Sequence, residues 1–473
     1  MKNSELMSMR IQTSLLAVGG LLVLQLSAVA QLKPTDSRSK PNVLLIIGDD
    51  LRDLSALPGP NTNRVIMPNL ERLAAKSMRF DRAYCQYPVC NPSRTSFLTG
   101  LRPDTTGVLD NSLFFRNTSV SNTVTLPQLF RQNGYQTVSL GKVFHNVKPA
   151  TIDWLSWDVC KILTDVSYAT DAIGNTGPTY NPTDGEFEWC YWRRANGNDD
   201  NQLDGKITLD ATNRLSQKQS KPFFMAVGLN KPHDPYIAPA KYFEQFPSNQ
   251  ISVHVDPANK SKDASLAIPP GPLKAAFAAF TEGERREFLQ AYYACAAFED
   301  AQIGRLLDAL DRNDWWENTI VIFISDHGYH LGERDWWNKV TIFELCARVP
   351  LYVYAPGMPN RGRHCARLIE LIDLYPTLAD LAGLPLPSML PGKSFRPLLT
   401  NPQLPWKQAA YTQVQHGKQT GYSVRTEQWR YTKWSTGEAE LYNHETDSGE
   451  WHNLASNRAY SNVVDQLNAL LPP

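Results

Sequence analysis

The segment from Cys90 to Gly100, CNPSRTSFLTG, has the residue types of an activated side chain at the start of a helix. Asn91 is a favourable N-cap and Pro92 fits the first helical position, so we predict that the helix begins just after Cys90. Gly100 is well placed to end this helix, because glycine favours the left-handed conformation found just after helices. Cys90 would then face the positive end of the helix dipole, with the guanidinium of Arg94 within one turn. Such a site can hold an anionic group against a reactive side chain. The alternative is a buried structural cysteine beside a surface arginine.

Polar residues follow four candidate buried strands at the point where each strand ends. In an open parallel sheet, ligands bind at the carboxyl ends of the strands, so these polar groups can meet although they lie far apart in the sequence. Asp and His also cap helices and fill turns, which is the alternative for each group taken alone. The strands and the residues that follow them are 43–47 with Asp49-Asp50, 136–140 with Gly141-Lys142 and His145, 223–229 with Lys231-Pro232-His233-Asp234, and 319–325 with Asp326-His327-Gly328.

Several of these side chains have the chemistry of metal ligands. The carboxylates of Asp49, Asp50 and Asp326 offer hard oxygen ligands, which suit Ca²⁺ or Mg²⁺. His327 is a less natural ligand for a hard ion, so ligand type alone leaves the metal open. The sequence has no CxxC, HExxH or His-rich cluster that would indicate zinc.

Other residues suit an anionic substrate. Lys142 and Lys339 are candidate point charges for an oxyanion. His145 and His233 are candidate proton carriers, because histidine titrates near neutral pH without a large perturbation. Trp336-Trp337, just before Lys339, could line a glycan subsite by stacking on sugar rings; ordinary packing of a loop is the alternative.

The elements that must position these residues predict an α/β fold. Apolar runs typical of buried strands alternate with helical patterns, which indicates a mostly parallel sheet wrapped by helices. The stretch 151–200, which contains many Trp, Asn and Gly residues, has weak hydrophobic periodicity. We expect it to be an insertion and not an independent domain. We predict a catalytic domain over 41–385, with a large mixed, mostly parallel sheet sandwiched by helices, and a smaller C-terminal α+β subdomain with an antiparallel sheet over 400–473. The supporting segments are helices near 69–78, 127–133 and 284–311, the insertion 151–200, the proline-rich connection 385–406, and the alternating stretch 422–434.

The N-terminus and the charge balance bear on localisation. The chain has 473 residues, with 47 basic and 47 acidic side chains, so net charge gives no indication of nucleic-acid or membrane-surface binding. Lys2 and Arg10 precede an apolar run over 15–26 that ends in Ala28-Val29-Ala30, typical of a secretory signal peptide over 1–30. A retained anchor is the alternative, but the run is short and interrupted. We predict an exported protein with no membrane span in the mature chain.

The seven cysteines are an odd number, which in an exported protein indicates one unpaired or chemically altered residue. Cys160 and Cys190 flank a polar loop and could form a disulfide across it. Cys295 lies in an apolar helical pattern and is expected to pack in the core.

These motifs together resemble a known family. The segment from Cys90 matches the C-x-P-S-R signature of the sulfatases, including the trailing Leu-Thr-Gly, and the four strand-end motifs fall where sulfatases of the alkaline-phosphatase-like superfamily carry metal and sulfate ligands. The stretches LRPDTTG, GKVFH, LNKPHDPY, SDHGYHLGE and GYSVRTEQWRYTKW are most similar to the iduronate-2-sulfatase branch. Phe97, Asn146 and Asp234 depart from the usual residues. If Asp234 faces the ring of His233, we expect it to raise the pKa of that histidine.

The resemblance implies a mechanism. Cys90 would be oxidised by a formylglycine-generating enzyme to Cα-formylglycine, whose hydrated aldehyde is the nucleophile. One Ca²⁺ would be bound by Asp49, Asp50, Cys90, Asp326 and His327. Arg94 and Lys142 would orient the nucleophile and the sulfate, while Lys339 would hold the sulfate. His233 would protonate the leaving alcohol, and His145 would act as the base that later helps eliminate sulfate.

The resemblance thus implies a sulfatase that acts on O-sulfate esters of a sulfated oligo- or polysaccharide, with 2-O-sulfated iduronate as one candidate. Its compartment would be periplasmic, secreted or lysosome-like. Two alternatives stay open: a phospho- or phosphonoester hydrolase on the same fold, and an inactive glycan-binding relative.

Overall fold

The main sheet of the protein has nine strands. The computed structural model describes residues 40–54, 65, 67–145, 148–387 and 390–471, so the predicted signal peptide over 1–30 and Asn146 lie outside the described residues. β12 (Arg363–Glu370) pairs with β2 beside the main path of the sheet. That path runs in the order β10 (Arg348–Val349), β2 (Met78–Tyr84), β11 (Leu351–Tyr354), β9 (Thr319–Ser325), β1 (Asn42–Asp49), β7 (Phe223–Pro232), β3 (Gln136–Gly141) and β4 (Val159–Lys161).

The centre of this sheet is parallel, as the apolar runs predict. β1 pairs in parallel with β9 on one side and with β7 on the other, and Ile46 is opposite both Phe323 and Val227. All eight residues of β1 are buried, which is why the strand is continuously apolar up to Gly48. β11 runs antiparallel to both β9 and β2. The sheet is therefore mixed and mostly parallel, which confirms the predicted fold class.

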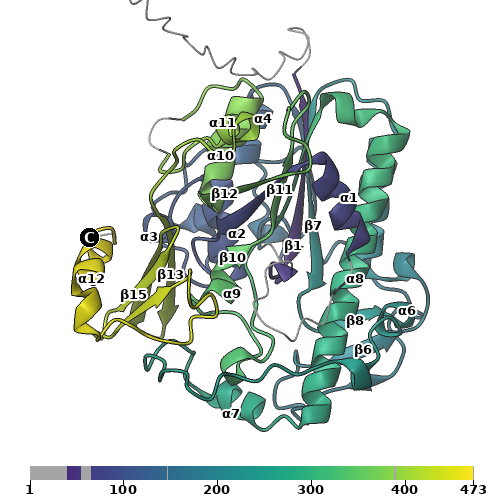
Figure 1. Ribbon diagram of the computed structural model, residues 1–473. Helices are drawn as coiled ribbons and strands as arrows, with labels where there is room; N and C mark the ends of the chain where they lie inside the picture. The colour runs from purple at the N-terminus through teal and green to yellow at the C-terminus, as the bar shows by residue number, and fades with distance from the viewer. Residues whose placement is uncertain (1–39, 55–64, 66, 146–147, 388–389, 472–473) are drawn as a thin grey trace, which may run out of the picture. The chain divides into compact units, whose positions relative to one another are not determined.

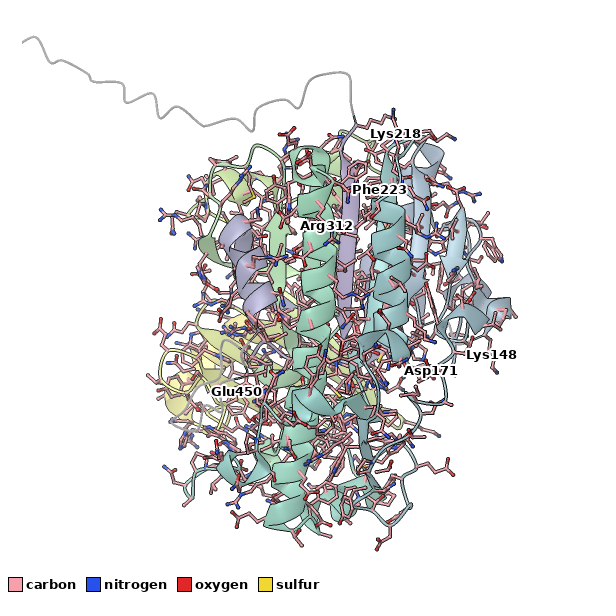
Figure 2. The ribbon with its side chains drawn as sticks, turned by 90° about the vertical axis from the view of Figure 1, so that its right-hand side faces the viewer. Lys148, Asp171, Lys218, Phe223, Arg312 and Glu450 are labelled. Atoms are coloured by element: carbon pink, nitrogen blue, oxygen red, sulfur yellow. The ribbon has the colours of Figure 1, made fainter. Side chains whose placement is uncertain are left out.

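Helices cover both faces of the sheet (Figure 1). One face carries α1 (Pro68–Lys76), α5 (Leu203–Leu215) and α8 (Glu282–Arg312), and the other carries α2 (Cys90–Thr99), α4 (Leu126–Gln132) and α10 (Leu374–Leu381). In Figure 2, which looks onto the first face, α8 runs down the middle and ends at Arg312. α8 begins with a capping box in which the hydroxyl of Thr281 accepts from the amide of Glu284. The helices expected near 69–78, 127–133 and 284–311 are confirmed.

The start of α2 differs from the prediction. The helix begins at Cys90, with Val89 as its N-cap, so Asn91 is not the cap. The side-chain amide of Asn91 instead donates to the carbonyl oxygens of Asp110 and Leu113, at 2.8 Å each. A tertiary contact has thus taken the side chain that local propensity assigned to the cap. The helix ends as predicted at Gly100, whose φ is 72°.

The insertion 151–200 is part of the same compact unit as the main sheet. Its longest strand, β6 (Trp192–Ala195), pairs in parallel with β8 (Tyr236–Pro239), just beyond β7, and antiparallel with β5 (Thr179–Tyr180). The remaining helical segments are short: α3 (Pro103–Thr106), α6 (Ala240–Phe243), α7 (Pro272–Ala278), α9 (Glu344–Ala347), α11 (Arg396–Thr400), and 3₁₀ turns at Phe115–Asn117, Pro149–Thr151, Val166–Tyr168, Asp199–Asn201, Ser248–Gln250, Trp315–Asn318, Glu333–Asp335, Leu371–Asp373 and Arg458–Tyr460.

A four-stranded antiparallel sheet follows near the C-terminus. Its strands are β13 (Ala410–His416), β14 (Gln419–Arg425), β15 (Trp429–Trp434) and β16 (Ala439–Asn443), in sequence order, and α12 (Ser461–Asn468) packs against β15. The alternating stretch 422–434 is therefore a hairpin, and the smaller α+β unit is present. Its exact boundary between 385 and 400 stays a prediction. Among the described residues, no helix is long and apolar enough to cross a bilayer.

The disulfide considered between Cys160 and Cys190 is not formed, because all seven cysteines are free thiols. Cys160 lies on β4 of the main sheet, opposite Ser139. Cys190 is fully buried in an aromatic cluster with Trp192, around the three-stranded sheet. The two thiols therefore pack in different parts of the molecule. Cys295 is fully buried on α8, as predicted.

Candidate active site

The structure brings the four strand-end motifs to one edge of the sheet. β9, β1, β7 and β3 are consecutive parallel neighbours, so their carboxyl ends lie side by side. The loop after β1 carries Asp50, the loop after β3 carries Lys142, the loop after β9 carries His327, and the end of β7 leads into His233. α2 approaches the same edge with its first residue, Cys90.

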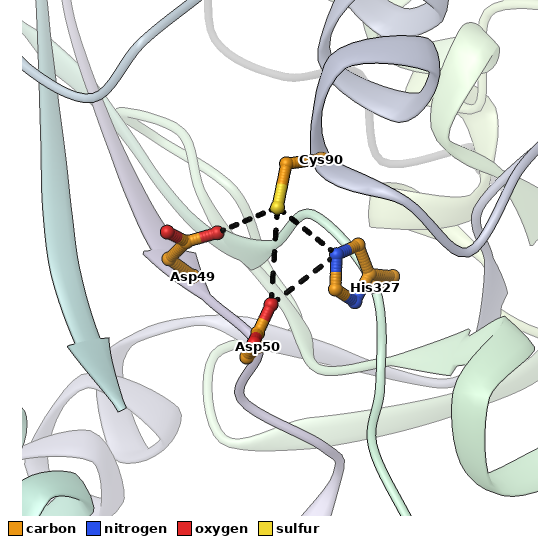
Figure 3. A group of neighbouring side chains, drawn as sticks. All are labelled: Asp49, Asp50, Cys90 and His327. Atoms are coloured by element: carbon orange, nitrogen blue, oxygen red, sulfur yellow. Dashed lines mark hydrogen bonds and ion pairs between the residues drawn. The ribbon is translucent and has the colours of Figure 1, made fainter. Parts of the chain in front are cut away.

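Cys90 Sγ lies at the centre of a buried cluster (Figure 3). It is 3.4 Å from Asp49 Oδ1, 3.9 Å from Asp50 Oδ1 and 3.4 Å from His327 Nε2. His327 Nε2 is also 3.3 Å from Asp50 Oδ1. All four residues are buried, so their charges lie in a low-dielectric environment where they must be matched by nearby partners.

This donor set fits a divalent cation. The ligand atoms of Asp49, Asp50, Cys90 and His327 lie within 4.8 Å of one another. His327 Nδ1 is 3.0 Å from the carbonyl oxygen of Gly328, which can only accept, so a neutral ring with its proton on Nδ1 leaves the Nε2 lone pair for a cation held between it and the carboxylates. Two carboxylates and one imidazole nitrogen directed at one point could hold a divalent cation.

Asp326 lies beside this group but is oriented differently. Its Oδ2 accepts from Arg94 Nε at 2.8 Å, and its Oδ1 accepts from the amides of Asp50 and His327 at 3.2 and 3.0 Å. Oδ1 is 3.8 Å from His327 Nε2, so it borders the cluster. Its place among the metal ligands stays a prediction.

Three buried cations surround the carboxylates. Lys142 Nζ forms an ion pair with Asp49 and lies 3.6 Å from Cys90 Sγ. Lys339 Nζ donates to both Asp50 oxygens, at 2.6 and 2.9 Å, and lies 3.2 Å from the same sulfur. Arg94 is fully buried and its NH2 is 3.3 Å from Asp49 Oδ1. Cys90 thus has positive charge on more than one side, as an anion-binding site needs.

The charges shift the pKa values of these groups in opposite directions. Burial raises the pKa of Cys90 well above that of a free thiol, and Asp49 adds to this shift. Burial would also raise the pKa of Asp49, but Lys142 and other nearby cations hold it well below its usual value. Burial opposes the charge of Lys339, yet Asp50 holds the pKa of this lysine well above its usual value. The unmodified thiol is therefore protonated, while Lys339 remains a cation.

The two candidate proton carriers are less deeply buried than the cluster itself. His233 is 21% exposed in its side chain, with Nε2 4.0 Å from Asp50 Oδ2. His145 is half-buried, and its Nδ1 has no hydrogen-bond partner among the described residues. Burial, together with Lys142, lowers the pKa of His145 to about 3. Both histidines are therefore neutral in the free protein near neutral pH.

Asp234 acts on His233 in the expected direction, but other groups decide the net shift of the pKa. Asp234 does lie against the ring of His233, with Oδ1 3.4 Å from Nδ1. The pKa of His233 is nevertheless well below its usual value, because burial and the charges of Lys142 and Lys339 outweigh the neighbouring groups that raise it. Burial also raises the pKa of Asp234 itself to about 6, which weakens its effect as an anion.

Trp336 and Trp337 do not form the glycan subsite that we considered. Trp336 is 2% exposed and Trp337 is fully buried. Their rings pack edge-on against Phe277 and Phe288, respectively, with centroids 5.3 and 5.0 Å apart. The packing alternative is therefore correct, because the loop carries its aromatic side chains inward.

Two residues outside the predicted site hold the Asp50 turn. Asp50 has a left-handed φ of 67°, unusual for a residue with a side chain. The hydroxyl of Tyr292, on α8, donates to Asp50 O at 2.7 Å and accepts from the amide of Arg52 at 3.1 Å. Ser325 Oγ accepts from the amide of Leu51 at 3.0 Å. Ser325 could have been suspected from its place before Asp326, but Tyr292 lies 242 residues from Asp50 and has no local signal.

Comparison with known proteins agrees with this geometry. The family model described as Sulfatase matches residues 41–384, and a model of the N-sulphoglucosamine sulphohydrolase C-terminal region matches 332–472. A sulfatase of Formosa agariphila is 32% identical over 92% of this chain and 86% of its own length. The iduronate 2-sulfatase of Homo sapiens is 32% identical over 83% of this chain and 84% of its own length.

A solved structure shows the same fold. The phosphonate monoester hydrolase of Silicibacter pomeroyi superposes with a TM-score of 0.76 at 21% identity, over 91% of this chain and 94% of the other. The family model spans the strands and loops that assemble the Cys90 cluster, and the full-length relatives extend the match through the C-terminal sheet. With its strand order, its buried Cys90 and its flanking cations in place, this chain belongs to the sulfatase family.

Proposed function

We propose that the protein is an exported sulfatase that hydrolyses O-sulfate esters of a sulfated glycan, with 2-O-sulfated iduronate as the first candidate. The observation that carries the proposal is the position of Cys90 Sγ, within 4 Å of Lys142, Lys339 and the acidic ligand group. Sγ marks where the oxygens of a formylglycine hydrate would lie after conversion of Cys90 by a formylglycine-generating enzyme. A nucleophile there has cations for the sulfate and carboxylates for a metal within reach.

The metal and the cations have separate roles in this proposal. Ca²⁺, held by Asp49, Asp50, Cys90, Asp326 and His327, would supply Lewis-acid stabilisation of developing negative charge. Lys142 and Arg94 orient the nucleophile and the sulfate, and Lys339 holds the sulfate. These side chains are fixed by burial and ion pairs before substrate binds, so little reorganisation is needed during the reaction.

The histidines supply the proton transfers. A sugar alkoxide is a poor leaving group, so His233 protonates it as the S–O bond breaks, and His145 accepts the proton when sulfate is later eliminated. Lys142 and Lys339 lower the pKa of His233 in the free protein. A bound sulfate would oppose these two charges and favour the protonated ring.

A phospho- or phosphonoester hydrolase is the rival activity, since the solved neighbour has the same fold. A sulfate monoester carries one negative charge and a phosphate monoester nearly two, so these two substrates place different demands on the same cations, whereas a phosphonate monoester carries one charge and must be compared directly. Matched aryl sulfate, aryl phosphate and aryl phosphonate substrates decide between them. We expect higher kcat/KM for the sulfate; a clear preference for the phosphate or the phosphonate would reverse the assignment.

The modification and the sugar need their own experiments. Mass analysis of the peptide that contains Cys90, from protein exported by its natural host or co-expressed with a formylglycine-generating enzyme, should show the aldehyde. An unconverted thiol in active protein would contradict the proposed nucleophile. The relatives include an iduronate 2-sulfatase at 32% identity, so a panel of defined sulfated oligosaccharides should begin with 2-O-sulfated uronates. The same material tests export and removal of residues 1–30.

A further inference from the structure

A valine in a left-handed backbone conformation follows Lys339. Val340 has a φ of 70°. A β-branched residue is a steric outlier there, because its methyl groups crowd the neighbouring carbonyl groups. Such a conformation persists only where surrounding contacts hold it, and it is found near functional sites. The direction in which Lys339 leaves the backbone depends on this turn.

Three contacts hold the two residues in place. The amide of Val340 donates to the carbonyl oxygen of Pro88 at 3.2 Å, two residues before Cys90. The indole of Trp336 donates to Lys339 O at 2.8 Å. The third contact is from outside the main sheet: His416 Nε2 lies 2.8 Å from Val340 O. His416 is the last residue of β13 in the C-terminal antiparallel sheet.

His416 is placed by its surroundings with little freedom. It is 8% exposed, and its ring packs against Trp434 with centroids 5.5 Å apart. Its second nitrogen, Nδ1, lies 2.8 Å from the carbonyl oxygen of Leu266. Both partners are carbonyl oxygens, so a neutral ring can donate to one of them and a protonated ring to both. Burial lowers the pKa of His416, so the neutral ring has one donor for these two oxygens and its other nitrogen carries no proton.

We propose that His416 is a positioning residue for Lys339. By donating to Val340 O it holds the strained turn, and the turn keeps Lys339 Nζ 3.2 Å from Cys90 Sγ. The C-terminal sheet would thereby contribute to sulfate binding without touching a reacting atom. This inference rests on the proposed function, in which Lys339 holds the sulfate.

The first test separates substrate binding from turnover. His416→Phe keeps a ring against Trp434 but removes both ring nitrogens and with them the hydrogen bond to Val340 O. We expect KM for an aryl sulfate and the inhibition constant of inorganic sulfate to rise about tenfold, with kcat changed less than about threefold, because a contact to sulfate before and during reaction is lost. His416→Gln retains one donor, so its KM and its inhibition constant for sulfate should lie between those of the wild type and those of His416→Phe. If neither variant changes KM or sulfate inhibition, the inference is wrong.

A matched control comes from the same strand. The hydroxyl of Thr412 on β13 donates to the carbonyl oxygen of Cys85 at 2.7 Å, so it also ties this sheet to the main sheet but does not contact the Lys339 turn. Thr412→Val should lower Tm without raising KM. An equal rise of KM in Thr412→Val would show that any loosened contact with the C-terminal sheet has this effect, and would overturn the specific role of His416.

A double-mutant cycle tests the strain directly. Glycine adopts a φ of 70° readily, so Val340→Gly keeps the turn with less need of external contacts. We expect the effect of His416→Phe on KM to fall from about tenfold to below about threefold in the Val340→Gly background. Equal effects in both backgrounds would contradict the proposal.

The Tm of the four proteins in this cycle can also be measured, and this measurement needs no sulfatase activity. If the wild type hydrolysed no sulfate ester, the proposed function would fail, but a smaller loss of Tm on His416→Phe in the Val340→Gly background would still show that His416 holds the turn. Additive losses of Tm would show that it does not.

Discussion

Among the residues that the structure describes, acids and histidines gather in two separate regions, one around Asp50 and one around Glu450, and these regions differ in how their charges are matched. In the first, Asp49, Asp50 and His327 surround Cys90, and the cations include two lysines, which are point charges without a fixed fork of donors. In the second, Glu344, His444 and Glu450 also lie within 4.8 Å of one another, between the main sheet and β16.

Guanidinium groups occupy the second cluster. Arg430 Nε is 2.5 Å from Glu450 and its NH2 is 2.5 Å from Glu344, while Arg425 Nε is 3.2 Å from Glu344. His444 Nε2 lies 2.9 Å from Glu450. Each carboxylate thus has a planar, charge-assisted partner. The comparison teaches that closeness of acids and histidine does not define a metal site: the second cluster is a structural ion-pair network, and only the first directs its groups at a reactive side chain.

The largest expected effect is on Cys90. Cys90→Ala removes the precursor of the nucleophile, so we expect kcat/KM for an aryl sulfate to fall about 10⁴-fold or more, with Tm little changed. Cys190→Ala is the matched control, because Cys190 is equally buried but packs in the aromatic cluster. Substantial turnover by Cys90→Ala would place the nucleophile elsewhere.

The second-largest expected effect comes from a substitution in the second cluster, and it lowers stability without changing substrate binding. Arg430→Met leaves Glu344 and Glu450 buried without their main cation, so the free energy of unfolding should fall by about 3–5 kcal/mol. Urea denaturation measures it. KM should stay within about twofold of the wild type, since the cluster does not contact the site. If KM rose as stability fell, the second cluster would also affect the active site and would not be purely structural.

Metal removal should act on the first cluster only. With the metal at about a thousand times its Kd, chelation should lower the free energy of unfolding by about 4 kcal/mol, visible as a fall in Tm. Asp50→Asn should abolish this response, while Glu450→Gln should retain it. The reverse pattern would assign the cation to the second cluster.

The smallest effect is the pH dependence of the second cluster. Burial would raise the pKa of Glu450, but Arg430 and His444 hold it at about 2 in the folded protein, against 4.5 when unfolded. Because the folded pKa is the lower one, the stabilisation is full above pH 4.5 and is lost as pH falls toward 2. Its size is about 3 kcal/mol. The free energy of unfolding of Glu450→Gln should therefore depend less on pH in this window; an unchanged slope would count against it.

Much of the fold and of the site could be predicted because the signals are local. The apolar run of β1 requires burial on both faces, and Lys142 and His327 each follow a buried strand directly. The strand order then places them together, since parallel strands end at the same edge.

The errors concern side chains whose partners are distant in the sequence. Asn91 has good capping propensity, but the loop at 110–113 takes its amide. Trp336 and Trp337 follow the motif closely, yet only the arrangement of α7 and α8 decides that they point inward. His416 has no catalytic motif around it, and its contact with Val340 O spans 76 residues.

The depth of Cys90 has a consequence for the order of events during synthesis. The thiol is completely enclosed once His327 is in place, and His327 is made 237 residues later. At 5–20 residues per second, the ribosome needs roughly 10–50 s to cover that interval. If Cys90 is converted as proposed, the oxidising enzyme must therefore reach the nascent or unfolded chain, because the folded protein does not expose the thiol.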